Sequence, residues 1–375
     1  MAELGLMKDN AKLRILFLAK AFPPQTGGVE TYSEQVALAY AKMGHDVTVL
    51  TAHPGSRGQE KRGDITVINV GQGGQLGVFA RLFKNLWALR SESFDMAHAT
   101  TWRVALPLML LRRSLRLVLT VHGREVFVVP TPLRPLMYRA MRRAELIPTV
   151  SQPILDMFQQ RLPFPLQGAF ANWNGISFED ECSSPHNKPG ALTISCMCRL
   201  VERKNIATAI KAVAELIREG YDVRYVIAGS GPEFDSLKML VDQEDMAERI
   251  TLLGRIPDED IVPFYRKSHI FLHPQIAARD GQDMEGFGLT IADAMSFGCV
   301  PIAGASGGPM DFIASGQTGF LVDGEDQSAI VSALKQVLDS DQTRKKISAA
   351  TQDFACKNLT WNMHAANILE KLNAD

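Results

Sequence analysis

The sequence predicts an α/β protein made of two Rossmann-like, doubly wound domains in series. Three observations carry this prediction. Strand-forming and helix-forming stretches alternate along most of the chain, the alternation restarts after a segment rich in Pro, Gly, Asn and Ser over 160–190, and 375 residues suffice for two domains of ordinary size. A hydrophobic fraction of 46% and a charged fraction of 22% are typical of a globular protein and exclude a disordered one.

The first half begins as strand, turn, helix and strand. Residues 13–19 form an apolar run typical of a buried strand, and a turn rich in Pro and Gly follows at 23–28. Helical periodicity then runs over 29–43 and ends at Gly44, before a β-branched strand at 46–51. Because a helix that connects two strands makes them parallel, this order predicts a parallel sheet. Further strands are expected at 96–99, 117–121 and 146–150.

The second half repeats this rhythm after the expected linker. The strand at 223–228 runs into Gly229-Ser-Gly, and the helix over 205–219 ends at Gly220. The other expected strands are 192–198, 250–253, 270–273 and 300–303, and the other helices are 234–243, 288–297 and 330–338.

These segments predict a first domain over residues 1–180 and a second over 181–358. Ligands in such folds bind beyond the carboxyl ends of the strands, so two units that face each other would place a site in the cleft between them.

The five cysteines form no ligand spacing and no disulfide framework that we recognise, which favours a reducing compartment. Cys196 and Cys198 would share one face of a strand, where apolar packing is far more common than a metal site. The start, Met1 to Asn10, is not a signal peptide, and no apolar run reaches the roughly 18 residues of a membrane span. We therefore expect a cytoplasmic protein. The remaining cysteines are Cys182, Cys299 and Cys356.

Charge is distributed unevenly. Residues 1–150 hold twenty Lys and Arg against eleven Asp and Glu, whereas residues 151–375 hold twenty against thirty. Segment 81–143 interleaves its cations with apolar residues, which is typical of a surface that lies on an anionic membrane. The alternative is that these cations solvate helix faces or pair with the acidic second half, and no nucleic-acid-binding module accompanies them. The cations are Arg81, Lys84, Arg90, Arg103, Arg112, Arg113, Arg116, Arg124, Arg134, Arg139, Arg142 and Arg143.

Two short motifs suit phosphate binding. Gly27 and Gly28 lie between the first strand and first helix, where the backbone can approach an anion closely, although a plain turn has the same composition. Arg199 and Lys204 flank the end of strand 192–198, and paired cations suit a diphosphate. A solvated cluster that also includes Glu202 and Arg203 would look the same.

Two carboxylates, Glu285 and Asp293, bracket a glycine-opened helix. On a continuous helix they would lie roughly 12 Å apart along the axis, a separation that lets one bind a sugar and the other a ribose. The N–H groups after Gly286 would receive the phosphates between them. In the alternative, Glu285 is a helix N-terminal acid and Asp293 a surface residue.

The order of these motifs resembles the retaining GT-B glycosyltransferases of family 4, also called glycosyl transferases group 1. The resemblance covers nearly the whole chain. It rests on Gly27-Gly28, His122-Gly123, Asn174-Gly175, Arg199 with Lys204, Gly229-Ser-Gly-Pro232, Glu285-Gly-Phe-Gly and Gly307-Gly308.

The resemblance implies a role for each matched residue. Gly27 and Gly28 would contact the donor phosphate, His122 would lie close to the transferred sugar, and Arg199 with Lys204 would hold the diphosphate and stabilise the leaving group. The donor nucleotide would also contact Gly229, Arg255, Ile256, Glu285, Gly286, Phe287, Gly288, Leu289 and Asp293. The C-terminal segment 359–375 would pack back on the first domain.

Two positions depart from the family pattern. Asp293 stands where Glu is usual, and Asp311 stands where Glu often follows the Gly307-Gly308 turn. Because Asp is one methylene shorter, its contact with the ribose would lengthen or pass through water, which puts donor affinity in doubt.

The sequence therefore predicts a retaining glycosyltransferase that moves a sugar from a nucleotide-diphosphate sugar to a saccharide or lipid-linked acceptor. No metal or other cofactor is expected, because Arg199 and Lys204 would carry the charge. Attachment to the inner face of the membrane is the hypothesis for where it works. A nucleotide-sugar sensor without turnover is the alternative from another class, and an epimerase on this fold is a weaker one.

Overall fold

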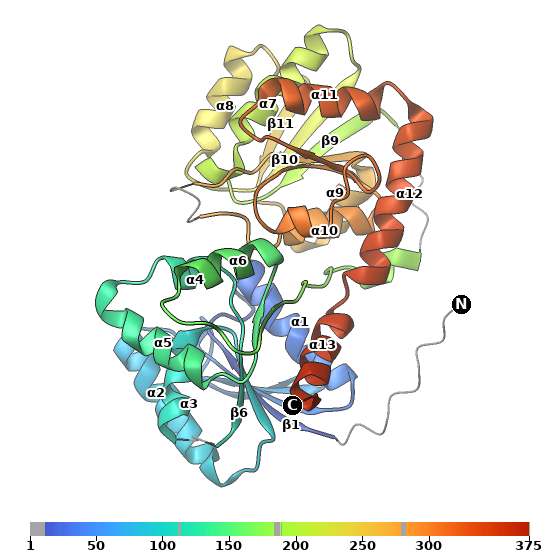
Figure 1. The fold of residues 1–375 in the computed structure, drawn as a ribbon. Coiled ribbons are helices and arrows are strands. Elements are labelled where there is room, and N and C mark those ends of the chain that lie inside the picture. The colour runs from blue at the N-terminus through green and yellow to red at the C-terminus, as the bar shows by residue number, and fades with distance from the viewer. Residues whose placement is uncertain (1–11, 112–113, 184–187, 189, 279–282, 375) are drawn as a thin grey trace. The chain divides into compact units, whose positions relative to one another are not determined.

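The computed structural model describes residues 12–111, 114–183, 188, 190–278 and 283–374 (Figure 1). The expectation for Met1 to Asn10 and the basic residues Arg112 and Arg113 fall outside these ranges. The chain divides into two compact units, which are described separately below. Unit 1 comprises residues 1–148, 163–170 and 364–375, and unit 2 comprises 149–162 and 171–363.

Unit 1 is built on a six-stranded sheet that is parallel except at its first pair. Its central strand is apolar and fully buried, since Ile15 to Ala19 are each at most 1% exposed. Burial on both faces is typical of parallel strands between helices. The strand order is β3 (Gly58–Arg62), β4 (Ile65–Asn69), β2 (Asp46–Thr51), β1 (Arg14–Ala19), β5 (Met96–Ala99) and β6 (Arg116–Leu119).

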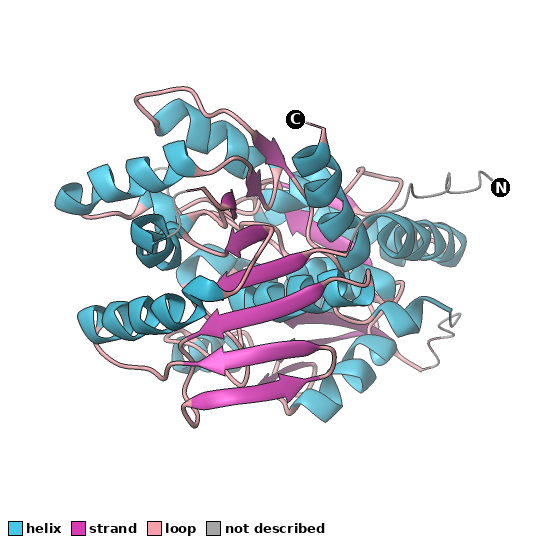
Figure 2. Ribbon diagram, turned by 90° about the horizontal axis from the view of Figure 1, so that it is seen from below, coloured by secondary structure: helices cyan, strands magenta, loops and turns pink. Residues whose placement is uncertain are grey.

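Helices flank this sheet. In Figure 2 the strands, in magenta, lie side by side with cyan helices on either side of them. The main helices of this part of the chain are α1 (Gly28–Lys42), α2 (Gln75–Ala88), α3 (Trp102–Leu111), α4 (Arg124–Phe127) and α5 (Arg134–Arg143). A small sheet of β7 (Ile147–Thr149) and β8 (Ala169–Ala171), with α6 (Gln152–Arg161) between its strands, lies where the chain passes between the units.

Unit 2 carries a second six-stranded sheet, and all its neighbouring strands are parallel. Its order is β11 (Ile250–Gly254), β10 (Val223–Ala228), β9 (Leu192–Met197), β12 (Ile270–His273), β13 (Val300–Gly304) and β14 (Phe320–Val322). In sequence order this is 3-2-1-4-5-6, the Rossmann arrangement, and the direction of winding reverses between β9 and β12. The two predicted Rossmann-like domains are confirmed.

The core of unit 2 follows from helical periodicity. In α7 (Ile206–Arg218) the apolar residues Ile206, Ile210, Val213 and Leu216 lie on one stripe and are fully buried. The other helices are α8 (Phe234–Gln243), α9 (Asp258–Lys267), α10 (Leu289–Ser296), α11 (Gln327–Leu338) and α12 (Asp341–Asn358), with short 3-10 turns η3 (Glu179–Ser183), η4 (Glu202–Lys204) and η5 (Gly308–Asp311).

A buried polar network in unit 1 includes His364, near the start of the last helix, α13 (Trp361–Asn373). The Tyr32 hydroxyl lies 2.8 Å from Thr120 Oγ1 and 3.0 Å from His364 Nε2. His98 adds a contact of 2.7 Å to Thr120 and one of 3.1 Å to the Tyr40 hydroxyl. The segment from His364 onward thus has polar partners in unit 1, whereas Trp361 to Met363 group with unit 2.

The structure corrects the reading of the cysteines. Cys182 in η3 and Cys356 in α12 form a disulfide, and Cys196, Cys198 and Cys299 are free and buried. Because 174 residues separate the bonded pair, its pairing is invisible in local spacing. The argument from cysteines for a reducing compartment is therefore withdrawn. No helix in the described ranges has the length and apolar character to cross a bilayer.

The segment expected as a linker, 160–190, contains structure of its own, namely the end of α6, strand β8 and turn η3. Along this segment the chain belongs to unit 2 up to residue 162, to unit 1 over 163–170 and to unit 2 again from 171. The sequence predicts a single boundary near residue 180. The chain passes between the units more than once, and no single compositional break marks that.

Candidate functional site

The candidate site of unit 2 lies at the carboxyl ends of β9 and β12, where the winding of the sheet reverses. Arg199 and Lys204 lie in the loop after β9, and Glu285 lies in the loop after β12. The loops are tied together, because the Ile276 N–H donates to the Arg203 carbonyl at 2.9 Å. This edge of a doubly wound sheet is where such folds bind ligands.

A charged cluster forms the centre of this site. Lys204 Nζ contacts Glu285 Oε2, and Arg203 Nη1 lies 2.7 Å from the same oxygen. Arg203 Nε also lies 3.4 Å from Asp283 Oδ1. Burial alone would raise the pKa of Glu285, but the positive charges of Lys204 and Arg203 outweigh it and hold that pKa well below its usual range. Glu285 is therefore a carboxylate at any physiological pH.

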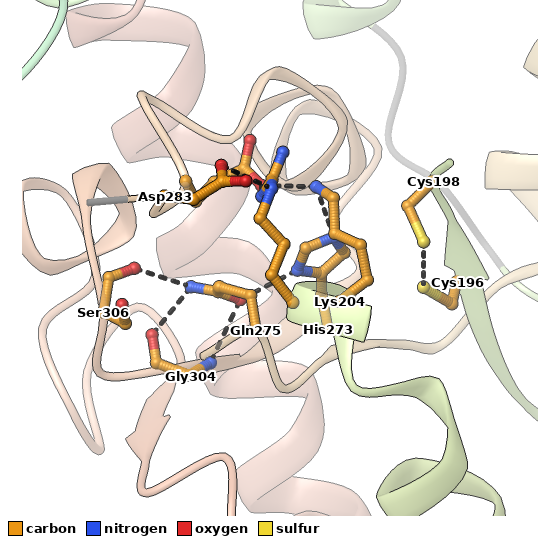
Figure 3. A network of polar contacts seen from close by, with 10 residues as sticks. Cys196, Cys198, Lys204, His273, Gln275, Asp283, Gly304 and Ser306 are labelled. Atoms are coloured by element: carbon orange, nitrogen blue, oxygen red, sulfur yellow. Dashed lines mark hydrogen bonds and ion pairs between the residues drawn. The ribbon is translucent and has the colours of Figure 1, made fainter. Parts of the chain in front are cut away.

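His273 and Gln275, which are uncharged, form a chain of hydrogen bonds that leads away from the Lys204 ammonium group (Figure 3). Lys204 Nζ lies 3.2 Å from His273 Nε2, and His273 Nδ1 lies 2.8 Å from Gln275 Oε1. The Gln275 amide nitrogen donates to the carbonyls of Gly304 and Ser306 at 2.7 and 3.2 Å. Because Gln275 Oε1 accepts, His273 carries its proton on Nδ1 and offers the lone pair of Nε2 to Lys204.

Arg199 does not join this cluster. Its side chain is exposed and makes no hydrogen bond or ion pair with any other residue in the described part of the chain. Arg203, which the sequence left as one member of a solvated cluster, is instead the second partner of Glu285. The local sequence Glu202-Arg203-Lys204 forms the 3-10 turn η4, which directs both cations to one carboxylate.

Asp293 faces inward. It lies within α10, is only 6% exposed, and its Oδ1 accepts the Ser177 N–H at 2.6 Å. Burial raises the pKa of Asp293 to about 7, although the hydrogen bond from Ser177 opposes this. The expectation that Asp293 is either a surface residue or a simple ribose ligand is incomplete, because one of its oxygens already has a protein partner.

Asp311 also has a structural task. Its Oδ2 accepts the Gln152 N–H at the start of α6 (2.7 Å) and the Trp173 indole N–H (3.0 Å). Burial raises the pKa of Asp311, and these two hydrogen bonds oppose the rise. The residue acts as an N-terminal cap for a helix that is distant in sequence.

Glycines let the site loops pack closely. A Cβ on Gly229 would meet the Cys198 carbonyl oxygen at 1.8 Å, and one on Gly308 would meet Phe287 Cα at 2.5 Å. The Gly308 N–H donates to the Glu285 carbonyl at 2.9 Å, which ties the Gly307-Gly308 turn to the loop that carries Glu285. Only glycine fits these positions, which explains both glycine motifs.

The Glu285-Gly-Phe-Gly segment ends where α10 begins. Gly288 adopts a left-handed backbone (φ 94°) immediately before Leu289, the first residue of the helix. Phe287 is 3% exposed and packs on Phe312 at 5.0 Å between ring centroids. The Gly286 carbonyl accepts the Ser151 hydroxyl at 2.7 Å. This arrangement leaves the first N–H groups of α10 without helical partners, as at any helix start.

The remaining nucleotide candidates of unit 2 lie on adjacent loops at the same edge of the sheet. The Gly229 N–H donates to the Gly254 carbonyl at 2.8 Å, next to Arg255 and Ile256. Arg255 is exposed, and Ile256 is half-buried.

The other candidates lie in unit 1. Gly27 is the residue before α1, in an extended conformation, and Gly28 is the first residue of that helix. His122 packs edge-on against Tyr32 at 4.7 Å between ring centroids, and its Nε2 is buried without a partner among the described residues. Burial lowers the pKa of His122 to about 4, although a hydrogen bond with the Thr100 backbone opposes this. His122 is therefore neutral, with a nitrogen available as an acceptor.

One cluster in the described residues has the make-up of a metal site: Cys196, Cys198 and His273. Two acidic pairs with Asp-x-Asp spacing also occur, at 258–260 and 339–341, but they mark helix starts. Asp258 opens α9, and Asp341 opens α12 while pairing with Lys345 at 2.6 Å. Acids are favoured at helix N-termini for that reason alone.

Sequence reasoning found Lys204 and Glu285 but missed Arg203 as a partner, and it missed His273 and Gln275 entirely. His273 and Gln275 are single residues at a strand end, and no spacing or periodicity distinguishes them. The Pro274 between them, which ends β12, is the only local signal.

The chain matches two family models. The model for glycosyl transferases group 1 matches residues 179–354, and the model for glycosyltransferase family 4 matches residues 26–178.

Among curated relatives, the chain is 26% identical over 379 aligned positions to the GDP-mannose-dependent alpha-(1-6)-phosphatidylinositol monomannoside mannosyltransferase of Mycolicibacterium smegmatis. This alignment covers 96% of this chain and 98% of the relative. It is also 26% identical over 238 positions to the putative colanic acid biosynthesis glycosyltransferase WcaL of Escherichia coli. That alignment covers 62% of this chain and 57% of the relative.

Among solved structures, the chain is similar to Anabaena Alr3699/HepE in complex with UDP and glucose. The TM-score is 0.77 at 21% identity, and the match covers 97% of this chain and all of the other. At this identity the likeness shows the fold alone.

Proposed function

This chain belongs to the glycosyl transferases group 1 family and has its GT-B fold, and on that premise we propose that it is a retaining, metal-independent glycosyltransferase. It moves a sugar from a nucleotide-diphosphate sugar to an acceptor used in glycolipid or polysaccharide synthesis. The observation that carries the proposal is the partly buried Lys204–Glu285–Arg203 cluster at the switch point of the unit 2 sheet.

Glu285 serves as the ligand of the donor sugar. Because Lys204 and Arg203 keep it ionised, it has only acceptor oxygens to offer, and vicinal sugar hydroxyls are matching donors. The acid is not a nucleophile in this proposal, because Lys204 and Arg203 offset its negative charge.

Lys204 and Arg199 bind the diphosphate. As the bond between the anomeric carbon and the phosphate oxygen breaks, the electron pair and negative charge pass to the diphosphate, where fixed cations stabilise them. Arg199 is exposed and therefore available to a phosphate. The acceptor hydroxyl attacks on the same face, and its proton passes to the departing phosphate oxygen, so the α configuration is retained. These cations replace a metal ion.

The glycine loops and the start of α10 complete the donor site. The loops pack closely at Gly229 and Gly308, and the first turn of α10 offers main-chain N–H groups to a phosphate. Arg255 and Ile256 contact the base, and Asp293 contacts the ribose through the oxygen that Ser177 does not use. In unit 1, Gly27, Gly28 and the free acceptor nitrogen of His122 serve the phosphate and the transferred sugar.

The acceptor is a saccharide or a lipid-linked saccharide, and the protein attaches peripherally to the inner face of the membrane. Arg81 supports this poorly, because its guanidinium is bound to the Val70 and Gly71 carbonyls. Lys84 and Arg139 support it, because they are exposed on α2 and α5 beside the exposed apolar side chains of Trp87 and Leu136.

A cavity of about 700 Å³ in unit 1 adds support for an acceptor with an apolar part. Phe79, Trp102 and Leu136 line it together with Lys20 and Arg103. Sedimentation with anionic vesicles at low and high salt tests the membrane proposal, with Lys84→Glu/Arg139→Glu as the charge-reversed variant. Salt-sensitive binding that the variant loses is expected, and wild-type protein that stays in the supernatant at low salt would refute it.

The transferase proposal is tested with a panel of donors. GDP-mannose and UDP-glucose are the first donors to try, because one relative is named as GDP-mannose-dependent and one structural neighbour was solved with UDP-glucose. Thermal shift with UDP, GDP and ADP identifies the base. We expect one nucleotide to raise the melting temperature and its sugar to be turned over, with an α-linked product by NMR. Tight binding without turnover or donor hydrolysis would favour the nucleotide-sugar sensor.

A further inference from the structure

Two thiols and one imidazole meet beside Lys204. The Cys196, Cys198 and His273 side chains are buried, and their ligand atoms all lie within 4.8 Å of one another (Figure 3). We propose that these three residues bind one thiophilic d¹⁰ metal ion, with Zn²⁺ as the physiological example. None of the three residues is a donor-binding group in the proposed function, but His273 contacts Lys204, and the bound ion inhibits transfer.

The fold brings the ligands together. β9 and β12 are adjacent parallel strands, with Ile194 paired to Ile270 and Ser195 to Phe271. Cys196 and Cys198 are two residues apart at the carboxyl end of β9, so they share a face, and His273 ends β12 beside them. Sequence spacing alone favoured apolar packing for the two thiols, because it could not show the histidine.

The sulfur spacing already matches zinc. Cys196 Sγ and Cys198 Sγ are 3.8 Å apart. With Zn–S bonds of about 2.3 Å, two sulfurs of a tetrahedral site lie about 3.8 Å apart. The two thiols therefore need no large rearrangement to become ligands. Two thiolates and one imidazole form a ligand set that selects Zn²⁺ and related soft ions over Mg²⁺ or Mn²⁺.

His273 is prepared as a ligand by its neighbour. Its Nδ1–H donates to Gln275 Oε1, so the lone pair lies on Nε2. Histidines that bind metals almost always donate their other ring N–H to an oxygen in this way, which fixes the tautomer and the ring orientation. Gln275 is fixed in turn by the Gly304 and Ser306 carbonyls.

A buried hydroxyl points to the same place. Tyr225 is fully buried on β10, and its hydroxyl faces the Cys196 thiol without an oxygen or nitrogen partner among the described residues. In the register of β10 and β9, Tyr225 pairs with Ile194, and Ile227 pairs with Cys196. Tyr225 therefore lies on the same face of the sheet as Cys196, next to it along the strands. Buried hydroxyls are costly when unpaired. A metal-bound Cys196 thiolate would accept this hydrogen bond.

Inhibition follows from a shared lone pair. His273 Nε2 now faces Lys204 Nζ at 3.2 Å and cannot serve the ammonium group and a metal ion together. A bound dication would also repel Lys204, which contacts Glu285. This effect on turnover rests on the proposed function, whereas metal binding does not.

The test uses purified full-length protein with its disulfide intact and no histidine tag. Zinc content is measured by mass spectrometry after dialysis against Zn²⁺ and then metal-free buffer, and Co²⁺ titration reports thiolate ligands by charge-transfer absorption. We expect one ion per chain with two thiolates. Cys198→Ser and His273→Gln should each weaken binding about 100-fold or more.

Two controls separate this cluster from other thiols. Cys299→Ser removes another buried cysteine, and the double variant Cys182→Ser/Cys356→Ser removes the disulfide. Both should bind Co²⁺ like the wild type. Absence of a stoichiometric ion in the wild type, or charge-transfer absorption that persists in Cys196→Ser/Cys198→Ser, would overturn the site. Zn²⁺ bound at one ion per chain without loss of turnover would overturn the inhibitory role alone.

Discussion

The two units bury their polar groups in different ways. In unit 2, Lys204, Arg203 and Glu285 form a charged cluster in which one carboxylate serves two cations. In unit 1, Tyr32, Thr120, His98 and His364 form a neutral network that joins α13 to the sheet. Buried charges are expensive unless paired, so such a cluster is a weak source of stability.

The difference separates ligand binding from structure. Cations held against a carboxylate can exchange part of that contact for a phosphate, and the carboxylate can then receive sugar hydroxyls. The neutral network has no such exchange to offer, because its members satisfy one another. His122, also in unit 1, differs from the members of this network, because its buried Nε2 has no hydrogen-bond partner among the residues that the structure describes.

The largest effect should come from the cations. We expect Lys204→Ala to lower kcat about 10²-fold or more, and Arg199→Ala to lower it by a similar factor, because the diphosphate gains charge in the transition state. Release of the nucleoside diphosphate measures this. Lys345→Ala is the matched control, since Lys345 pairs with Asp341 at the surface, where ion pairs contribute little. Near-normal turnover in both variants would remove the donor-site assignment.

Asp293 should give unit 2 a distinctive pH dependence. Its pKa is about 7 when folded and about 3.9 when unfolded, so the folded state binds more protons between these values. Its stabilising contribution is therefore complete below about pH 4 and is lost as pH rises through about 7, by a few kcal/mol in free energy of unfolding. Asp293→Asn removes this titration.

The comparison is made by chemical denaturation of the wild type and Asp293→Asn at pH 5 and pH 8. The variant should gain stability relative to the wild type at the higher pH, while other titrating groups cancel in the difference. An equal difference at the two pH values would mean that Asp293 is ionised when folded and that its burial is not as described.

Tyr32→Phe tests the neutral network. Loss of the hydroxyl leaves Thr120 and His364 with one partner fewer, and we expect a loss of about 1–3 kcal/mol in free energy of unfolding. Donor affinity should stay the same, since the network does not belong to the unit 2 site. A variant that keeps its stability would show that the network is not structural.

Asp311→Ala gives the smallest effect among these. The residue caps α6 through Gln152 and accepts from Trp173, so about 0.5–2 kcal/mol of stability should be lost while donor affinity is kept. Isothermal titration with the donor and a denaturation curve check both parts. A marked loss of donor affinity would place Asp311 among the ligand-binding residues.

Sequence predicted the fold well because parallel strands such as β1 and β9 are continuous apolar runs and their helices end at glycines. It missed the β3–β4 hairpin, since Gly58–Arg62 is polar and exposed, and it did not place α2, α9 or α12. Lys204 and Glu285 were predicted because their motifs are local. Local patterns do not encode contacts between distant segments. Such contacts determine the roles of His273 and Gln275, the burial of the Asp293 side chain and the Cys182–Cys356 disulfide.

The central claim is that the Lys204–Glu285 cluster serves glycosyl transfer from a nucleotide-diphosphate sugar. Mass-spectrometric detection of the nucleoside diphosphate and of the transferred or hydrolysed sugar, in chelator-treated buffer, tests it most directly. We predict that the wild type releases both products from one donor of the panel and that folded Glu285→Gln releases neither at a comparable rate. Donor that is bound by the wild type and recovered intact, with no product from any member of the panel, would contradict the account.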